Sequence, residues 1–257
     1  MTHSRFAIFN LRFQRGCRSC LLLLALRFCL MNSSGAATED FFAQGLALSH
    51  AGQFSDATAA FQNVSKQKPA GGALVNLGLA EWQRGNAGAA VLAWEQARWI
   101  DPFDPRARQN LKFARSVLQL DEPPLKWFEA ASSWLAADAW VWIASTSLWL
   151  AVGALVLPRF FRWRKSGWQQ VLAGLGLCFF IFAMAANVGV LSRTDIGYVV
   201  KKNTPLLLTP TREGEVILTL NDGEPARKIK SHGNYFLIQT ESSSGWIKRD
   251  DFGLVCE

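Results

Sequence analysis

Two long runs of uncharged, mostly apolar residues constrain this chain more than any other feature. They cover residues 139–157 (AWVWIASTSLWLAVGALVL) and residues 171–191 (VLAGLGLCFFIFAMAANVGVL). At about 1.5 Å rise per residue, such helices reach roughly 29–32 Å, which matches the ~30 Å hydrocarbon core of a bilayer. Soluble helices need a polar stripe, and neither run has one. We therefore predict a membrane-spanning hairpin rather than two helices buried in a soluble core.

A basic segment, residues 158–170 (PRFFRWRKSGWQQ), separates the two runs and contains no acid. Short loops rich in Lys and Arg stay in the cytoplasm. The cations that we expect to set the topology are Arg159, Arg162, Arg164 and Lys165. Both flanking parts of the chain are therefore predicted on the extracytoplasmic side.

Residues 1–37 have the pattern of an export signal. Five arginines and no acid lie in the first 31 residues, the apolar stretch CLLLLAL covers residues 20–26, and Gly35-Ala36-Ala37 offers small residues for cleavage. The net charge of +7 comes from this segment and the basic loop: without their nine cations, 18 basic residues remain against 20 acidic ones. We therefore expect no nucleic-acid partner.

Residues 38–104 contain an internal repeat with a period of 33 residues. Its matched pairs are Gly45 and Gly78, Gly52 and Gly85, Ala57 and Ala90, Phe61 and Trp94, Val64 and Ala97, and Pro69 and Pro102. Small residues let two antiparallel helices approach, the aromatic residue fills the space between helix pairs, glycine makes the turn and proline ends the second helix. This pattern resembles the tetratricopeptide repeat (TPR).

A helix over residues 105–118 is predicted to cover the second repeat, with Asp104 as N-cap and Pro105 at its first position. Together with the repeats it forms an all-α unit over residues 38–120. Two repeats and a cap are a minimal array, so a partner, a second copy or the membrane surface is expected to cover the remaining apolar surface.

The first helix of each TPR pair lines the concave face of such an array. The residues predicted there are Phe42, Leu46, His50, Val75, Leu79 and Trp82. They form a groove for a peptide or a partner helix, or they pack on one another and on the neighbouring helix. Residues 121–138 link the array to the membrane, either as an amphipathic helix at the interface or as an extension of the first spanning helix.

Residues 192–257 change to short alternating runs separated by turn signals such as Asn221-Asp222-Gly223. Five or more short strands at this spacing predict a small all-β barrel. The order of the pieces resembles the bacterial SH3-like (SH3b) domain, and Gly245-Trp246-Ile247 is the most specific mark. Tyr235 stands where the domain often has a tryptophan, which weakens the expectation of an aromatic ligand shelf.

The order of signal, TPR pair, basic-looped hairpin and SH3b domain resembles the BatE-type proteins of the aerotolerance operons. This resemblance implies an inner-membrane scaffold, encoded beside von Willebrand A-domain membrane proteins and a MoxR-type AAA+ ATPase. It supplies no active-site residues.

The sequence shows no catalytic, cofactor or metal motif, its three histidines are scattered, and Cys17-x-x-Cys20 has no second pair for zinc. We expect a non-enzymatic protein, with two hypotheses for its role. In the first, the TPR recruits a protein partner outside the cytoplasm and the hairpin holds the complex. In the second, the SH3b domain binds peptidoglycan and acts as an envelope sensor or tether.

Overall fold

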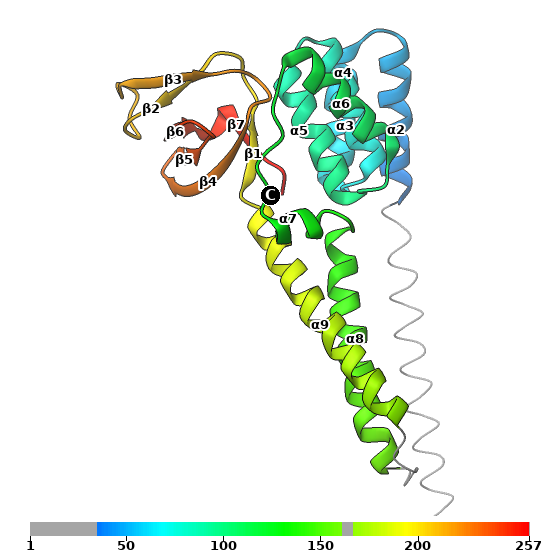
Figure 1. The fold of residues 1–257 in the computed structure, drawn as a ribbon. Helices are drawn as coiled ribbons and strands as arrows, with labels where there is room; N and C mark the ends of the chain where they lie inside the picture. Colours follow the sequence, from blue (N-terminus) through cyan, green and yellow to red (C-terminus); the bar gives the residue numbers. More distant parts are fainter. Residues whose placement is uncertain (1–34, 161–166, 257) are drawn as a thin grey trace, which may run out of the picture.

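The computed structural model describes residues 35–160 and 167–256. The export signal predicted over residues 1–37 lies almost entirely outside this range, as do Arg162, Arg164 and Lys165. Arg159 lies within a helix, but its side chain is outside the described part of the structure. The described chain contains a helical array, a two-helix hairpin and an antiparallel sheet (Figure 1).

The helical array consists of five consecutive helices, each of which packs on the next. They are α2 (Gly35–His50), α3 (Phe54–Gln67), α4 (Gly71–Gln83), α5 (Ala87–Ile100) and α6 (Pro105–Leu118). As expected, α6 begins at Pro105, and the Asp104 carboxylate accepts the Arg106 backbone N–H at 2.8 Å. Hydrogen bonds from Arg106 also lower the pKa of Asp104 below its ordinary value, which favours the charged cap.

The sequence repeat corresponds to repeated contacts between helices. A Cβ added at Gly45 would lie 2.7 Å from the Phe61 ring, and one at Gly78 would lie 2.3 Å from the Trp94 indole nitrogen. Phe61 and Trp94 are both fully buried. The turn glycines Gly52 and Gly85 have φ of +74° and +81°, a region that L-residues with side chains rarely adopt. The two helix pairs therefore use equivalent residues in equivalent ways.

The hairpin is formed by α8 (Ala137–Phe160) and α9 (Gly167–Arg193). Both are long and apolar enough to cross a membrane, with mean hydropathies of 1.8 over Ala137–Pro158 and 2.2 over Gly167–Arg193. Only 17% and 22% of their most apolar windows are buried inside the protein, so most of this apolar surface is exposed in the described structure. Small residues allow the contact between them: a Cβ at Gly176 would lie 2.9 Å from the Ser147 carbonyl oxygen.

The helices reach further into the predicted loop 158–170 than its sequence suggested. Helix α8 continues two residues past Pro158, and α9 already begins at Gly167. Pro158 lacks the N–H that would bond one turn back, so one internal hydrogen bond of α8 is lost there. The segment between the helices is therefore shorter than predicted.

The C-terminal part is a seven-stranded antiparallel sheet, here called the β module, with the order β3-β2-β6-β5-β4-β1-β7. Its strands are β1 (Ile196–Val199), β2 (Thr204–Leu207), β3 (Val216–Leu220), β4 (Pro225–His232), β5 (Tyr235–Gln239), β6 (Ser244–Lys248) and β7 (Phe252–Leu254). Alternate residues of these strands form one apolar core, which includes Leu206, Ile238 and Ile247. The switch from helical to strand periodicity after residue 192 is confirmed.

The β module covers the apolar surface that a two-repeat array leaves open. Ile196 and Tyr198 of β1 share one core cluster with Val91, Trp94 and Leu111 of the array. The sequence indicated that a partner, a second copy or the membrane would cover this surface, whereas a strand of the same chain does so. Tyr198 is buried, and burial raises the pKa of its phenol well above the ordinary value.

Gly88 marks the closest approach between the array and the β module. A Cβ at this position would lie 2.4 Å from the Val199 carbonyl oxygen and 2.6 Å from that of Val200. Backbone atoms cannot move aside as a flexible side chain can. The second residue of α5 therefore has to be a glycine if helix and strand are to meet as they do.

We predict that Gly88→Ala lowers the free energy of unfolding by about 1–3 kcal/mol, because the methyl group forces helix and strand apart. Gly72→Ala is the matched control: Gly72 is also the second residue of its helix, and its nearest added contact is the Arg106 guanidinium at 4.0 Å. Thermal unfolding followed by tryptophan fluorescence measures both. Equal stability of the two variants would contradict the close approach.

Candidate functional site

A buried ion pair joins the short helix before the hairpin to the β module. Glu129 lies in the short helix α7 (Trp127–Ser132), and its side chain is fully inaccessible to solvent. Arg227 of β4 donates to both of its carboxylate oxygens, at 3.0 Å each. Arg227 also donates to the carbonyl oxygen of Ser192, near the end of α9, at 2.9 Å. This set of contacts is called the joint below.

Local structure explains why α7 presents its glutamate here. The Glu129 carboxylate accepts the Lys126 backbone N–H at 2.9 Å, which satisfies a donor at the start of the helix. The Ser192 hydroxyl donates to the same carboxylate. On the other side, a Cβ at Gly189 would lie 2.3 Å from the Phe128 carbonyl oxygen, so α7 lies directly against α9. Helix α7 is a separate helix at the end of the hairpin rather than an extension of α8.

The pKa of Glu129 reflects two opposing effects. Burial alone would raise it, but hydrogen bonds from Ser192, the Lys126 backbone and Arg227 outweigh burial, and the pKa lies below its ordinary value. The carboxylate is therefore charged at neutral pH, and the joint is an ion pair.

A second set of polar contacts lies in the helical array, and a cation–π contact beside it reaches the end of α9. Glu95 of α5 pairs with Arg98 at 2.8 Å and with Arg115 at 2.6 Å. Arg193, the last residue of α9, stacks over the Trp99 ring with its guanidinium carbon 4.7 Å from the centroid. The end of the hairpin therefore contacts both the β module and the array.

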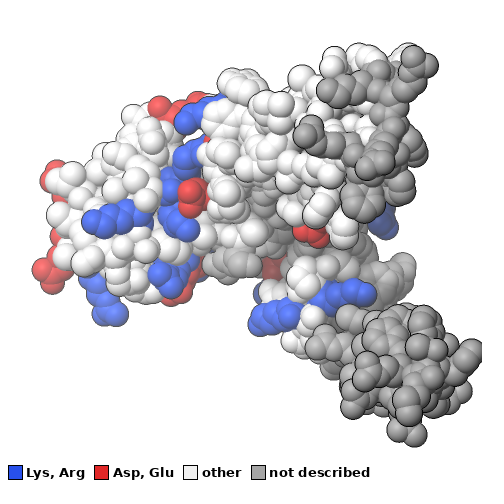
Figure 2. Space-filling view, turned by 90° about the horizontal axis from the view of Figure 1, so that it is seen from below, with Lys and Arg blue, Asp and Glu red and all other residues white. Residues whose placement is uncertain are grey.

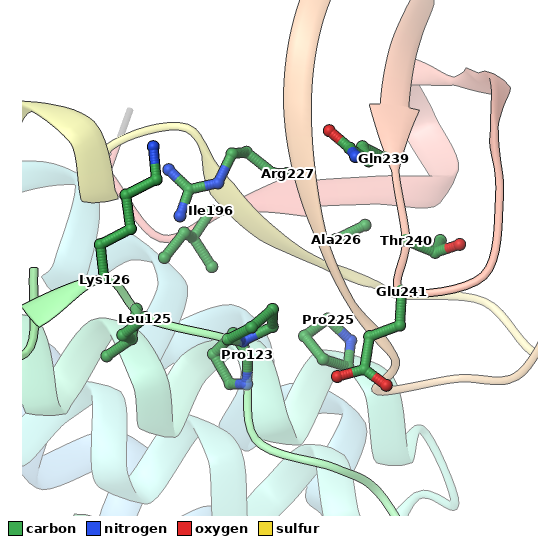
Figure 3. A pocket seen from close by; sticks show the side chains of 11 residues that line it. Pro123, Leu125, Lys126, Ile196, Pro225, Ala226, Arg227, Gln239, Thr240 and Glu241 are labelled. Carbon is green, nitrogen blue, oxygen red and sulfur yellow. The ribbon is translucent and has the colours of Figure 1, made fainter.

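Beside the joint lies an open cavity of about 670 Å³ between the segment after α6 and strands β4 and β5. Pro123, Leu125, Ile196 and Pro225 give it apolar walls (Figure 3). Figure 3 shows Lys126 and Arg227 toward one end and the Glu241 carboxylate toward the other. Cavities of this volume hold small molecules or short peptide segments. This cavity can accept a ligand with opposite charges at its two ends.

The exposed surface of the β module carries charges of both signs and shows no extended face of one sign in the view of Figure 2. Seen from below (Figure 2), Lys and Arg alternate with Asp and Glu over the exposed surface of the β module. Within residues 35–160 and 167–256, no group of three or more His, Cys, Asp or Glu side chains is arranged to hold a metal ion.

Four of the six residues predicted for the concave face of the array are buried or half-buried. Phe42 packs edge to face on Phe61 at 5.8 Å between ring centroids, and Leu46 joins the same cluster. Trp82 lies between Trp94 and Phe113. Phe42, Leu46 and Trp82 therefore pack on neighbouring helices, which was the second of the two possibilities.

Val75 fits the alternative that these side chains pack on neighbouring helices. It is buried in the core and its carbonyl oxygen accepts the Trp94 indole N–H at 3.1 Å, so it is not a surface residue. Its side chain packs in the cluster that includes Phe61 of α3 and Ala97 of α5. Leu79 and His50 are the exposed members of the set.

The residues predicted as SH3b marks occupy neighbouring strands. Gly245 is buried, and a Cβ there would lie 2.6 Å from the Leu206 side chain. Trp246 of β6 is half-buried and meets the His232 ring edge to face at 6.1 Å. Tyr235 is also half-buried and pairs with Lys248 across the strands. Trp246 and Tyr235 lie apart from the cavity, which strands β4 and β5 line with other residues.

No protein-family model matches this chain, and no curated protein matches it. Sequence reasoning missed Glu129 and Arg227, which lie 98 residues apart and carry no local motif. A weak signal was present: Glu129 is an acid in a mostly apolar stretch, at the third position of a helix that follows two prolines.

We predict that Glu129→Gln lowers the free energy of unfolding by up to about 3–5 kcal/mol, because it leaves the Arg227 guanidinium without its counter-ion. Because the guanidinium is partly exposed, the lower end is expected. A double-mutant cycle with Arg227→Gln should give a coupling free energy of about 1–3 kcal/mol. The control is Asp195→Asn: Asp195 pairs with Lys228 at 3.5 Å in an exposed position, where loss costs under about 1 kcal/mol.

The same pair predicts how stability depends on pH. Because folding lowers the Glu129 pKa, the pair contributes fully above the ordinary glutamate pKa of about 4.3 and loses its contribution as the pH falls through the lower folded-state value. The melting temperature of the parent protein should therefore fall more steeply in acid than that of Glu129→Gln. Parallel pH curves would contradict this assignment.

Proposed function

We propose that the protein is a non-enzymatic scaffold of the bacterial inner membrane. In this proposal the hairpin spans the bilayer, the TPR-like array and the SH3b-like β module lie on the extracytoplasmic side, and both offer surfaces to protein partners. The resemblance to BatE-type proteins places the expected partners among A-domain membrane proteins of a MoxR-linked envelope complex.

The observation that carries the proposal is the joint. Glu129, Arg227 and Ser192 bind α7, β4 and α9 to one another, and β1 shares a core with the array. A chain built as a flexible tether needs no such connection. A scaffold benefits from it, because partners bound to the array and to the β module are then held in a fixed arrangement over the membrane.

The topology in this proposal rests on the basic segment of residues 158–170. We predict that Ser116→Cys and Ser242→Cys, each in a chain with its native cysteines replaced by serine, react with a membrane-impermeant maleimide in intact spheroplasts. Both serines are exposed, one on α6 and one before β6. Ser166→Cys should react only after permeabilisation. The reverse pattern would overturn the extracytoplasmic placement.

Partner binding by the array is testable with a photo-crosslinking amino acid. At Leu79, which is 41% exposed on α4, we predict a crosslink to a membrane protein, whereas the same amino acid at the exposed Gln62 of α3 should give none. Absence of any crosslink from Leu79, together with co-sedimentation of the detergent-solubilised protein with purified murein, would favour the peptidoglycan-binding alternative instead.

A further inference from the structure

Strand β3 forms a free edge of the sheet. It occupies one end of the strand order, and its only neighbour in the described part of the chain is β2, from the pair Thr204–Leu220 to the pair Leu207–Val216. Its other edge therefore offers backbone N–H and C=O groups that no described strand uses. Such an edge is a template for one more strand.

The side chains of β3 do not protect this edge. Val216, Ile217 and Leu218 are 53%, 43% and 40% exposed, and Leu220 alone is buried within the strand. Natural edge strands usually carry lysine, proline or inward-pointing charges, and residues 216–220 (VILTL) have none. A register irregularity at Ile217 interrupts the edge, but it leaves the pairing from Leu218 to Leu220 regular.

Acidic residues bracket the apolar strand at both ends. Glu213 and Glu215 precede it, and Asp222 and Glu224 follow it. None of the four forms an ion pair within the described residues, although Glu224 accepts the Asn221 backbone N–H at 3.0 Å. Arg212 is the only cation in this stretch. The edge therefore combines an apolar centre with negative ends.

This charge pattern indicates which kind of partner can bind along the free edge of β3. A second copy would align one acidic bracket with another, and like charges on paired strands are destabilising. A lipid surface does not fit either, because β3 crosses the side of the β module that faces away from α8 and α9 (Figure 1). A strand with an apolar centre and basic ends fits, because its apolar residues match the centre of β3 and its cations pair with the acidic residues at both ends.

We propose that β3 binds an extended segment of a partner protein by strand addition, and that this segment has alternating apolar residues flanked by Lys or Arg. Backbone hydrogen bonds supply the pairing, Val216 and Leu218 supply apolar contact, and the acidic brackets select the basic flanks. This surface is separate from the cavity and from Leu79, so it adds a binding site to the scaffold proposed above.

The test uses the full chain in nanodiscs and three synthetic peptides. The probe is Lys-Arg-Val-Thr-Val-Thr-Val-Arg-Lys; its controls have Glu in place of the four cations, or Pro in place of the central Val. Fluorescence anisotropy measures binding, and hydrogen–deuterium exchange measures the amides of residues 216–220. We expect the basic peptide to bind at least about tenfold more tightly than either control and to slow exchange at β3.

Variants separate strand addition from other modes of binding. Val216→Lys and Leu218→Lys should each weaken the basic peptide by roughly tenfold or more, because they place a repelling charge on the edge. Ile229→Lys is the matched control, since Ile229 is 55% exposed on β4. The proposal would be overturned if the acidic peptide bound as tightly as the basic one, or if exchange at β3 did not change on peptide binding. It would also be overturned if the protein formed a dimer that the β3 variants abolish, while peptide binding stayed unaffected by them. Melting curves show whether the lysine variants remain folded.

Discussion

The buried pair between Glu129 and Arg227 determines how the rest of the molecule is held together. A fully buried carboxylate is tolerated only with a charged partner and several hydrogen bonds, and here these come from Arg227 of β4, from the Ser192 hydroxyl at the end of α9 and from the backbone before α7. Each donor belongs to a different part of the chain. The carboxylate is therefore satisfied only when the hairpin, the short helix and the β module are all in place.

Two further contacts hold the helical array against the β module. Tyr198 and Ile196 fill the open end of the helical array, and Gly88 lets α5 meet the end of β1 at backbone distance. A minimal array of two helix pairs and α6 gains the neighbouring surface that longer repeat proteins obtain from a further repeat. The array and the β module are for this reason parts of one body, although they differ in secondary structure.

Much of the local structure was predictable from the sequence, because it follows from periodicity and turn chemistry. The apolar runs predicted the hairpin, the 33-residue spacing predicted equivalent roles for Phe61 and Trp94, and Asp104-Pro105 predicted the start of α6. The assembly of these parts was not predictable. Glu129 and Arg227 meet across 98 residues, and Val75 is buried in a cluster with residues of α3 and α5, so neither position could be assigned without the tertiary contacts.

The central claim is that the array and the β module form one rigid body above the hairpin. Distance distributions between spin labels at His50→Cys in the array and Ser242→Cys in the β module, measured in nanodiscs by pulsed electron paramagnetic resonance, test it directly. The account predicts a single narrow distribution that stays unchanged between detergent and bilayer. A broad distribution, as from two domains on a flexible linker, would contradict it.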